Sequence, residues 1–325
     1  MRLIAGAALC IGLAGCSTLP SDSVSTDTGP APRCDRSVPW TYAAAGREIF
    51  CGVHADGCAE CWGDEPEADT GWDSGPGLHD FGQYDIPNVG FESVVSIVSP
   101  YPQARNRGLC GLTIDREAVC WGRSPAEFSG HYSEVRVGED FQCGLRSEGG
   151  VECPQYRSFG DLFPADATTF DFSGYIAGAL RPDGELWLGL YETRFERVDA
   201  PAVPYVAMDV TENDPSFGPW FVVCAIRETE QSLDCWNASD DGSTGEVIDT
   251  VPPGTFTTVC LTADDHACAL DEAGYPTCWG DGPMGEPVEP LSQLSCGYSD
   301  ACGVTFDGRL LCWGACDHGE CDVPG

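Results

Sequence analysis

One phrase recurs along this chain and limits the folds that are open to it. Two cysteines stand ten or eleven residues apart, an apolar residue lies two positions after the first, and Trp-Gly follows the second in most copies. The copies begin at Cys51, Cys110, Cys143, Cys224, Cys268 and Cys302. A further copy, which begins at Gly178, keeps the register but has lost both cysteines. Their joint loss indicates that the two cysteines of one copy bond to each other.

The spacing predicts a β-hairpin in each copy. If the two cysteines face each other across antiparallel strands, three residues form the loop, and a loop of this length needs a left-handed residue at its end, usually Gly. Five copies supply it: Ala55-Asp56-Gly57, Ser147-Glu148-Gly149, Pro182-Asp183-Gly184, Glu272-Ala273-Gly274 and Phe306-Asp307-Gly308. We expect different turns in the copy that has Arg116 at this place and in the longer Cys224 copy.

Alternation along the strands assigns the two faces of each hairpin. The cysteines share one face with the apolar residue at the third position, such as Val53 or Leu112, and we expect this face to be buried. The Trp after the second cysteine points the other way, against a neighbouring unit. Because a single hairpin cannot bury two faces, the units must stack.

A third strand precedes each hairpin. Apolar segments such as Phe91–Val95 and Phe256–Val259 follow turn-rich stretches with Gly and Pro. The seven copies start between positions 51 and 302, so their mean spacing is about 42 residues, which suits the blades of a β-propeller. The longest interval carries an insertion, Glu65–Asp80, which we interpret as a surface loop.

The repeat resembles that of the regulator-of-chromosome-condensation (RCC1) family, in its bacterial secreted branch, and is also similar to a seven-bladed bacterial β-lactamase-inhibitor protein. The best copies are His266–Gly280 and Ala301–Gly314, and the resemblance covers about residues 46–325. It implies an all-β, disulfide-rich, seven-bladed RCC1-like β-propeller, which we place at residues 34–325. The copies at Cys143 and Gly178 lack the Trp-Gly pair, so the blade edges are least defined there.

The N-terminus resembles the signal of a bacterial lipoprotein. Arg2 precedes an apolar stretch, Leu3–Leu13, which is too short to span a bilayer as a stable helix. The sequence Leu13-Ala14-Gly15-Cys16 then resembles a lipobox, in which the cysteine is acylated and becomes the new N-terminus. We therefore predict a signal peptide over residues 1–15 and lipidation of Cys16; the alternative is an ordinary secretory signal with a chance cysteine.

A flexible tether is expected over residues 16–33. This stretch is rich in Ser, Thr and Pro and has no apolar periodicity. Ser17, in place of an Asp, favours the outer membrane of a cell envelope as the location, on its periplasmic or its outer face.

The remaining cysteines are even in number, which in an exported protein suggests complete oxidation. Twelve of them form the hairpin pairs Cys51–Cys61, Cys110–Cys120, Cys143–Cys153, Cys224–Cys235, Cys268–Cys278 and Cys302–Cys312. For the other six, we expect Cys260–Cys296 between neighbouring blades, Cys316–Cys321 across a short loop, and Cys34–Cys58 between the N-terminus and the first blade. Six cysteines allow many connectivities, and this is one of them.

Metal binding is the competing interpretation of some of these cysteines. Cys58-Ala-Glu-Cys61 and Cys316-Asp-His318-Gly-Glu-Cys321 place ligand types close together, but zinc sites of this kind usually need paired knuckles at regular spacing. Asn237–Gly242 is faintly like a calcium loop, yet Ile248 stands where Glu is expected. We therefore expect no metal and no cofactor.

Composition and motifs narrow the function classes. With 16 basic residues, all Arg, against 52 acidic ones, the formal charge of −36 repels phosphate backbones. The nuclear family's nucleotide exchange and chromatin binding are therefore not expected here. No nucleophile elbow, His-Glu-x-x-His or phosphate loop occurs, and His266 is expected to be a structural residue at a blade start.

The sequence thus favours a monomeric, non-catalytic binding module, tethered by lipid to the envelope, with a protein or glycan ligand. The alternatives are a protein inhibitor of a secreted enzyme and an extracytoplasmic hydrolase.

Overall fold

The computed structural model describes residues 34–47, 49–63, 84–95, 108–122, 125–138, 142–191, 195–198, 201–213, 221–238, 245–316 and 319–324. They belong to one compact unit, Ala31–Gly325. The predicted signal peptide, the lipidated Cys16, the tether and the loop Glu65–Asp80 lie outside the described residues, so these remain predictions.

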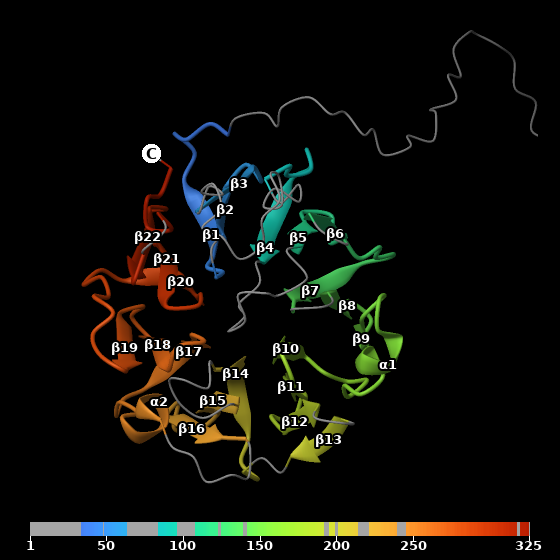
Figure 1. The fold of residues 1–325 in the computed structure, drawn as a ribbon, viewed down its shortest axis with the longest axis vertical. Coiled ribbons are helices and arrows are strands. Elements are labelled where there is room, and N and C mark those ends of the chain that lie inside the picture. The colour runs from blue at the N-terminus through green and yellow to red at the C-terminus, as the bar shows by residue number, and fades with distance from the viewer. Residues whose placement is uncertain are drawn as a thin grey trace, which may run out of the picture. The chain divides into compact units, whose positions relative to one another are not determined.

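Seven antiparallel sheets form the blades of a β-propeller, as the repeat predicts (Figure 1). The first strand of each blade lies nearest the centre of the ring, and the blades follow one another in chain order. Their strands are, blade by blade, β1 (Trp40–Ala44), β2 (Ile49–His54) and β3 (Ala59–Gly63); β4 (Phe91–Val95), β5 (Gly108–Thr113) and β6 (Ala118–Gly122); β7 (Tyr132–Val137), β8 (Gln142–Arg146) and β9 (Val151–Glu152); β10 (Thr169–Ser173), β11 (Ile176–Leu180), β12 (Leu186–Tyr191) and β13 (Phe195–Val198); β14 (Tyr205–Glu212), β15 (Phe221–Arg227) and β16 (Leu233–Asn237); β17 (Phe256–Leu261), β18 (His266–Asp271) and β19 (Pro276–Gly280); β20 (Leu291–Cys296), β21 (Asp300–Thr305) and β22 (Leu310–Gly314).

The hairpin register follows the cysteine spacing. In the first blade Cys51 lies directly opposite Cys61, with their Cα atoms 4.0 Å apart. The copy without cysteines keeps this register, because Gly178 lies opposite Leu188. Leu188 is fully buried, so an apolar side chain packed over a glycine replaces the disulfide of the other blades.

In six of the seven blades, the left-handed residue of the hairpin turn also docks the next blade. In the sixth blade Gly274 has φ +86°, and its carbonyl accepts a hydrogen bond from the amide of Leu291, the first residue of β20. The same bond recurs at five other junctions, as Phe91 to Gly57, Tyr132 to Arg116, Tyr205 to Gly184, Phe256 to Gln231 and Trp40 to Gly308. The last of these pairs joins blade seven to blade one, so the ring is closed by the same hydrogen bond that joins successive blades.

The expectation of a different turn at Arg116 was wrong. Arg116 adopts the left-handed conformation with φ 66°, its amide bonds the carbonyl of Thr113, and its carbonyl docks β7. A non-glycine residue is strained in the left-handed conformation. Arg116 adopts it nevertheless, and it forms the docking hydrogen bond and an ion pair with Glu92. The Cys224 copy does differ, because its loop is longer, but it also ends in a left-handed residue, Gln231.

Blades pack face to face, with the two faces assigned as the alternation predicts. Cys51 and Val53 are fully buried against the second blade, where Trp121 covers them. Trp279 and Trp313 pack in the same way on the fifth and sixth blades, each contacting the blade that precedes its own. The cores formed by these blades therefore combine a disulfide face with a tryptophan.

A glycine directly after the first cysteine has a packing role that sequence analysis did not identify. A Cβ atom at Gly111 would lie 2.4 Å from the ring of Phe91, and one at Gly144 would lie 2.7 Å from the ring of Tyr132. The missing side chain lets the large residue that begins the inner strand lie across the middle strand.

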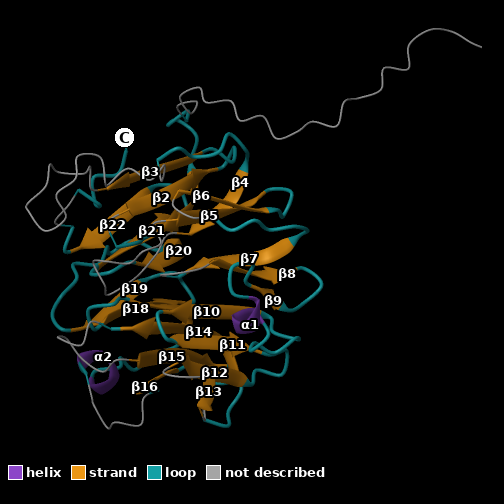
Figure 2. Ribbon diagram, turned by 45° about the vertical axis from the view of Figure 1, so that its right-hand side comes forward, coloured by secondary structure: helices purple, strands orange, loops and turns teal. Residues whose placement is uncertain are grey.

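The helices are short and lie at the outer rim of the ring (Figure 2). Both α1 (Arg157–Gly160) and α2 (Glu246–Asp249) have four residues, and they contact β9 and β16. No helix within the described ranges is long and apolar enough to cross a membrane.

Replacing Gly274 by Ala should destabilise the ring more than replacing Gly285 by Ala. Both residues have positive φ, +86° and +74°, so both substitutions introduce left-handed strain of about 1 kcal/mol. Only at Gly274 would the new Cβ meet backbone, 2.4 Å from the carbonyl oxygen of Leu291, whereas nothing lies within 4 Å at Gly285. Thermal unfolding of the oxidised proteins measures the difference, and equal losses for the two variants would contradict a docking role for the turn.

Candidate functional site

The inner strands enclose a cavity of about 280 Å³ at the centre of the ring. Six blades contribute polar side chains to its wall, among them Tyr42, Arg136, Asp171, Asp209 and Gln293. A polar cavity at the axis of a propeller is a natural candidate for a binding or catalytic site.

Arg136 is a basic residue in the wall of this cavity, which we call the channel. Its guanidinium forms an ion pair with Glu134 on its own strand, and its Nε lies 3.2 Å from Asp171 on β10. The side chain of Arg136 keeps 31% of its surface exposed. Burial raises the pKa of Glu134 even though Arg136 opposes the shift.

Asp171 and Asp209 form a carboxyl pair beside Arg136. Burial, together with the charge of Asp171 and a hydrogen bond between the two side chains, raises the pKa of Asp209 well above its ordinary value. The raised pKa favours the protonated form of Asp209, which can donate a hydrogen bond to Asp171.

The same acids cap the exposed edges of neighbouring strands. Asp209 accepts a hydrogen bond from the amide of Leu261 at 2.6 Å, and Asp171 accepts one from Val210 at 3.3 Å. These amides lie on the unpaired edge of an inner strand, where a backbone donor without a partner would be costly. The channel acids therefore hold blades together.

The last blade makes the same contact with neutral side chains. Gln293 accepts a hydrogen bond from the amide of Ala43 and donates one to its carbonyl, at 3.1 and 2.9 Å, and Ser295 accepts one from Ala45 at 3.0 Å. These contacts join the last blade to the first.

Sequence reasoning missed these channel residues. Arg136, Asp171, Asp209 and Ser295 occupy one equivalent position in the first strands of their units, and the cavity lining identifies that position. An alignment of the first strands, rather than of the hairpins alone, would have shown a polar residue recurring in an apolar context.

All eighteen described cysteines are in disulfides, in the pairs that the sequence suggested. The hairpin pairs are Cys51–Cys61, Cys110–Cys120, Cys143–Cys153, Cys224–Cys235, Cys268–Cys278 and Cys302–Cys312. Cys260–Cys296 joins β17 to β20 in the neighbouring blade, Cys316–Cys321 closes the C-terminal loop, and Cys34–Cys58 fastens the N-terminal segment to the first hairpin.

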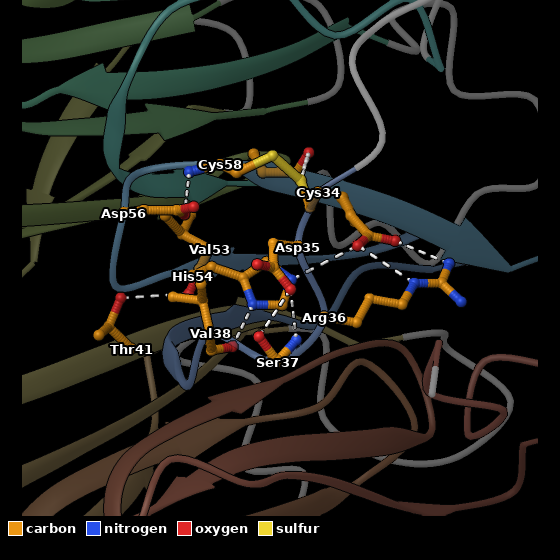
Figure 3. Close-up of polar contacts among 12 residues, drawn as sticks. Cys34, Asp35, Arg36, Ser37, Val38, Thr41, Val53, His54, Asp56 and Cys58 are labelled. Atoms are coloured by element: carbon orange, nitrogen blue, oxygen red, sulfur yellow. Dashed lines mark hydrogen bonds and ion pairs between the residues drawn. A yellow bond between two sulfur atoms is a disulfide. The ribbon is translucent and has the colours of Figure 1, made fainter.

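The cysteines proposed as alternative metal ligands are separated by this pairing. Cys58 and Cys61 belong to two different disulfides, with Cys34 and with Cys51. The structure instead brings His54 of β2 and Glu60 of β3 next to the Cys34–Cys58 bond (Figure 3). The second cysteine-rich stretch includes His318, which lies outside the described residues.

His266 has the structural role expected of it. Its Nδ1 lies 3.0 Å from a carboxylate oxygen of Asp264, and its Nε2 lies 2.8 Å from the carbonyl of Asp281. Burial alone would lower its pKa, but the hydrogen bond to Asp264 and the nearby charges outweigh burial, so the pKa is raised. Residues 239–242 of the weak calcium-loop pattern Asn237–Gly242 lie outside the described part of the chain.

No family model and no curated protein sequence matches the chain. Its fold is similar to the CRINKLY WD40 ectodomain of the Arabidopsis thaliana receptor kinase ACR4, with a TM-score of 0.58 and 17% identity over 86% of this chain and 96% of that one. It is also similar to Prp20p of Saccharomyces cerevisiae, with a TM-score of 0.51 and 12% identity over 79% and 80% of the chains. In its complex with Kap60 the same protein, there called yeast RCC1, gives 0.52 and 13% over 84% and 79%. The likeness shows that the chain has an RCC1-like β-propeller fold.

Neutralising Asp209 and neutralising Asp171 should have opposite effects. Folded Asp209 binds a proton that the unfolded chain releases near its ordinary pKa, so this group makes stability fall as pH rises through the interval between the two pKa values. Asp209→Asn should remove that fall, because an amide can still donate to Asp171 and accept from Leu261.

Asp171→Asn should instead lower stability by about 1–2 kcal/mol, because it takes away an ion-pair partner of Arg136. Thermal unfolding of both variants across a pH series provides the measurement. An Asp209→Asn protein that loses as much stability as Asp171→Asn at every pH would refute the assignment of the proton.

Proposed function

We propose that this chain is an exported, lipid-anchored bacterial protein whose propeller serves as a non-catalytic module for binding another protein. The observation that carries the proposal is the use of the channel's polar groups. Asp171, Asp209 and Gln293 are hydrogen-bonded to backbone of neighbouring blades, so the axis of the ring is a structural element and binding falls to the rim.

The same observation argues against catalysis in the channel. A carboxyl pair that shares a proton resembles a general acid and base, but here both members already hold backbone amides. Moving either one toward a substrate would leave a strand edge uncapped. A rigid ring with bonded walls is suited to presenting a surface.

Export is supported by the density of disulfides. Nine bonds in a chain of this length require an oxidising compartment. The plant protein with a similar fold is a receptor ectodomain, and the yeast protein is described as binding Gsp1p and histones, so propellers of this shape occur in protein recognition. The lipobox at Cys16 supplies the anchor.

Charge indicates the kind of partner. Many described arginines already pair with acids, as Arg146 does with Glu152 and Arg227 with Asp234. The surplus of acidic groups gives the surface a negative potential, which attracts basic proteins and repels nucleic acids.

The two ends of the blades differ in a way that places the binding face. The connection between the first two strands of a blade varies from residues 174–175 in the fourth blade to residues 96–107 in the second. At the opposite end the hairpin turns are nearly uniform. Length variation gathered on one face is typical of binding loops on a rigid scaffold.

A photo-cross-linking residue at Tyr175 should capture the partner in the native envelope, and one at Tyr275 should not. The two tyrosines are matched controls, because they are 46% and 48% exposed and lie at opposite ends of their blades. Mass spectrometry identifies what is captured. Equal capture at both positions would contradict the assignment of the face, and a captured glycan would replace the protein ligand.

Changing Cys16 to Ser should abolish acylation and leave the precursor uncleaved. Incorporation of a labelled fatty acid in a bacterial host and fractionation of the envelope measure this directly. Normal labelling of the variant would refute the lipobox, and the disulfide-bonded propeller itself should remain folded in either case.

A further inference from the structure

His54 has a buried ring nitrogen that no hydrogen-bond donor reaches. Its Nδ1 lies 2.7 Å from the carbonyl oxygen of Val38, and because a carbonyl only accepts, Nδ1 must carry the proton. Nε2 then presents its lone pair, without a hydrogen-bond partner, in a side chain with none of its surface exposed. It faces Oε1 of Glu60 at 3.4 Å. A neutral imidazole nitrogen and a carboxylate that face each other can share a cation, which is a proton or a metal ion.

Sulfur lies in the same place. Sγ of Cys34, a ring nitrogen of His54 and a carboxylate oxygen of Glu60 all lie within 4.8 Å of one another. Cys58 is bonded to Cys34, so its sulfur lies next to Sγ of Cys34. Figure 3 shows the disulfide above the imidazole, with the N-terminal segment, β2 and the following turn contributing the side chains.

The cluster is held in position by contacts that do not depend on the disulfide. Arg36 binds both oxygens of Glu60, at 3.0 and 3.4 Å, and the ring of Trp40 stacks on His54 with 3.7 Å between centroids. On the N-terminal segment, Asp35 accepts hydrogen bonds from the amide and the hydroxyl of Ser37. Cys34 would therefore stay near His54 if its bond to Cys58 were opened.

We propose that the Cys34–Cys58 pair is a redox-controlled zinc site. A dithiol reductant transfers two electrons and two protons to the disulfide, which yields two thiols, while the reductant itself becomes a disulfide. One Zn²⁺ then displaces the two thiol protons and binds Sγ of Cys34, Sγ of Cys58, Nε2 of His54 and a carboxylate oxygen of Glu60. Two thiolates, an imidazole and a carboxylate are ligand types that zinc takes in four-coordinate sites.

Second contacts of the kind that zinc ligands need are already present. A zinc-bound histidine usually donates its other N–H to a carbonyl, as His54 does to Val38. A bound carboxylate is usually hydrogen-bonded in turn, as Glu60 is by Arg36. In the oxidised protein the disulfide sulfurs carry no negative charge, so zinc affinity should be low until reduction.

Accessibility distinguishes this bond from those of the hairpins. In the hairpin bonds the first cysteine is always buried and the second is partly exposed in five of the six, whereas Cys34 and Cys58 are both partly exposed. Cys316 and Cys321 are also partly exposed, but the described residues include no His or Glu grouped with them within ligand distance. His318, in the loop that this pair closes, lies outside the described residues, so the control is a Cys316→Ser, Cys321→Ser variant, which removes this second reducible pair.

The test is zinc binding by the full chain before and after mild reduction with a phosphine, which has no thiol to compete for the metal. Peptide mapping verifies which bonds have opened. Reduced wild type and a Cys316→Ser, Cys321→Ser variant should each bind about one zinc per chain, and Co²⁺ should give a sulfur-to-metal charge-transfer band. Oxidised protein should bind at least about a hundredfold more weakly.

Variants separate a ligand role from a structural one. Cys34→Ser, Cys58→Ser should bind no zinc after reduction, while Glu60→Gln should keep the fold and weaken binding about tenfold. A single Cys34→Ser variant leaves the Cys58 thiol beside His54 and Glu60 and should bind zinc without any reductant. Circular dichroism verifies that each variant is folded.

Three results would overturn the proposal. The first is reduced wild type that binds no zinc, which would make His54 and Glu60 a buried ion pair with the imidazole charged. The second is undiminished binding in the Cys34→Ser, Cys58→Ser variant. The third is equal binding by the oxidised and reduced forms.

Discussion

The ring depends on one backbone hydrogen bond that is repeated from blade to blade. At six of the seven junctions the left-handed residue at the end of the hairpin turn accepts, through its carbonyl, a hydrogen bond from the first amide of the next inner strand, from Gly57 and Phe91 onward to Gly308 and Trp40. A residue with positive φ turns this carbonyl outward, and glycine also leaves room for the approaching strand. Hairpin formation and blade docking are thus specified by one position, so a sequence that repeats the hairpin also repeats the docking geometry and closes when the seventh copy meets the first.

This coupling explains how much of the fold could be predicted. The cysteine spacing fixes the hairpin register, because only one pairing places Cys51 opposite Cys61, and alternation then fixes which face carries Val53 and which carries the tryptophan. The turn at Arg116 was mispredicted, because glycine preference is an energetic tendency that docking contacts can override. The channel could not be derived in the same way. Which inner-strand side chains meet depends on the relation between blades, and Arg136, Asp171 and Asp209 come from three different blades.

The channel also shows how a strongly acidic chain uses acids as structural groups. Seven inner strands each leave an edge unpaired, and amides on those edges need acceptors. Asp and Glu provide acceptors, but grouped charges repel one another, so the cluster contains one arginine and a shared proton. At the seam between the last and first blades the neutral side chain of Gln293 bonds the strand edge instead. It accepts a hydrogen bond from the amide of Ala43 and donates one to its carbonyl, as a neighbouring strand would. The acidic side chains that do not make these contacts give the outer surface its negative charge.

The N-terminal cluster lies close to that seam, which gives its chemistry a structural setting. Two hydrogen bonds join the first blade to the C-terminal part of the chain. The amide of Trp40 donates to the carbonyl of Gly308, and the indole N–H of Trp62 donates to the carbonyl of Glu320. The segment from Cys34 to Val38 precedes Trp40 directly, and Trp40 stacks on His54. A disulfide holds this segment in the oxidised protein, and four ligands around a zinc ion would hold it in the reduced one. Both states keep the chain leaving the ring at the same point of the first blade, so a change of redox state would alter the chemistry of the cluster while leaving the closure of the propeller intact.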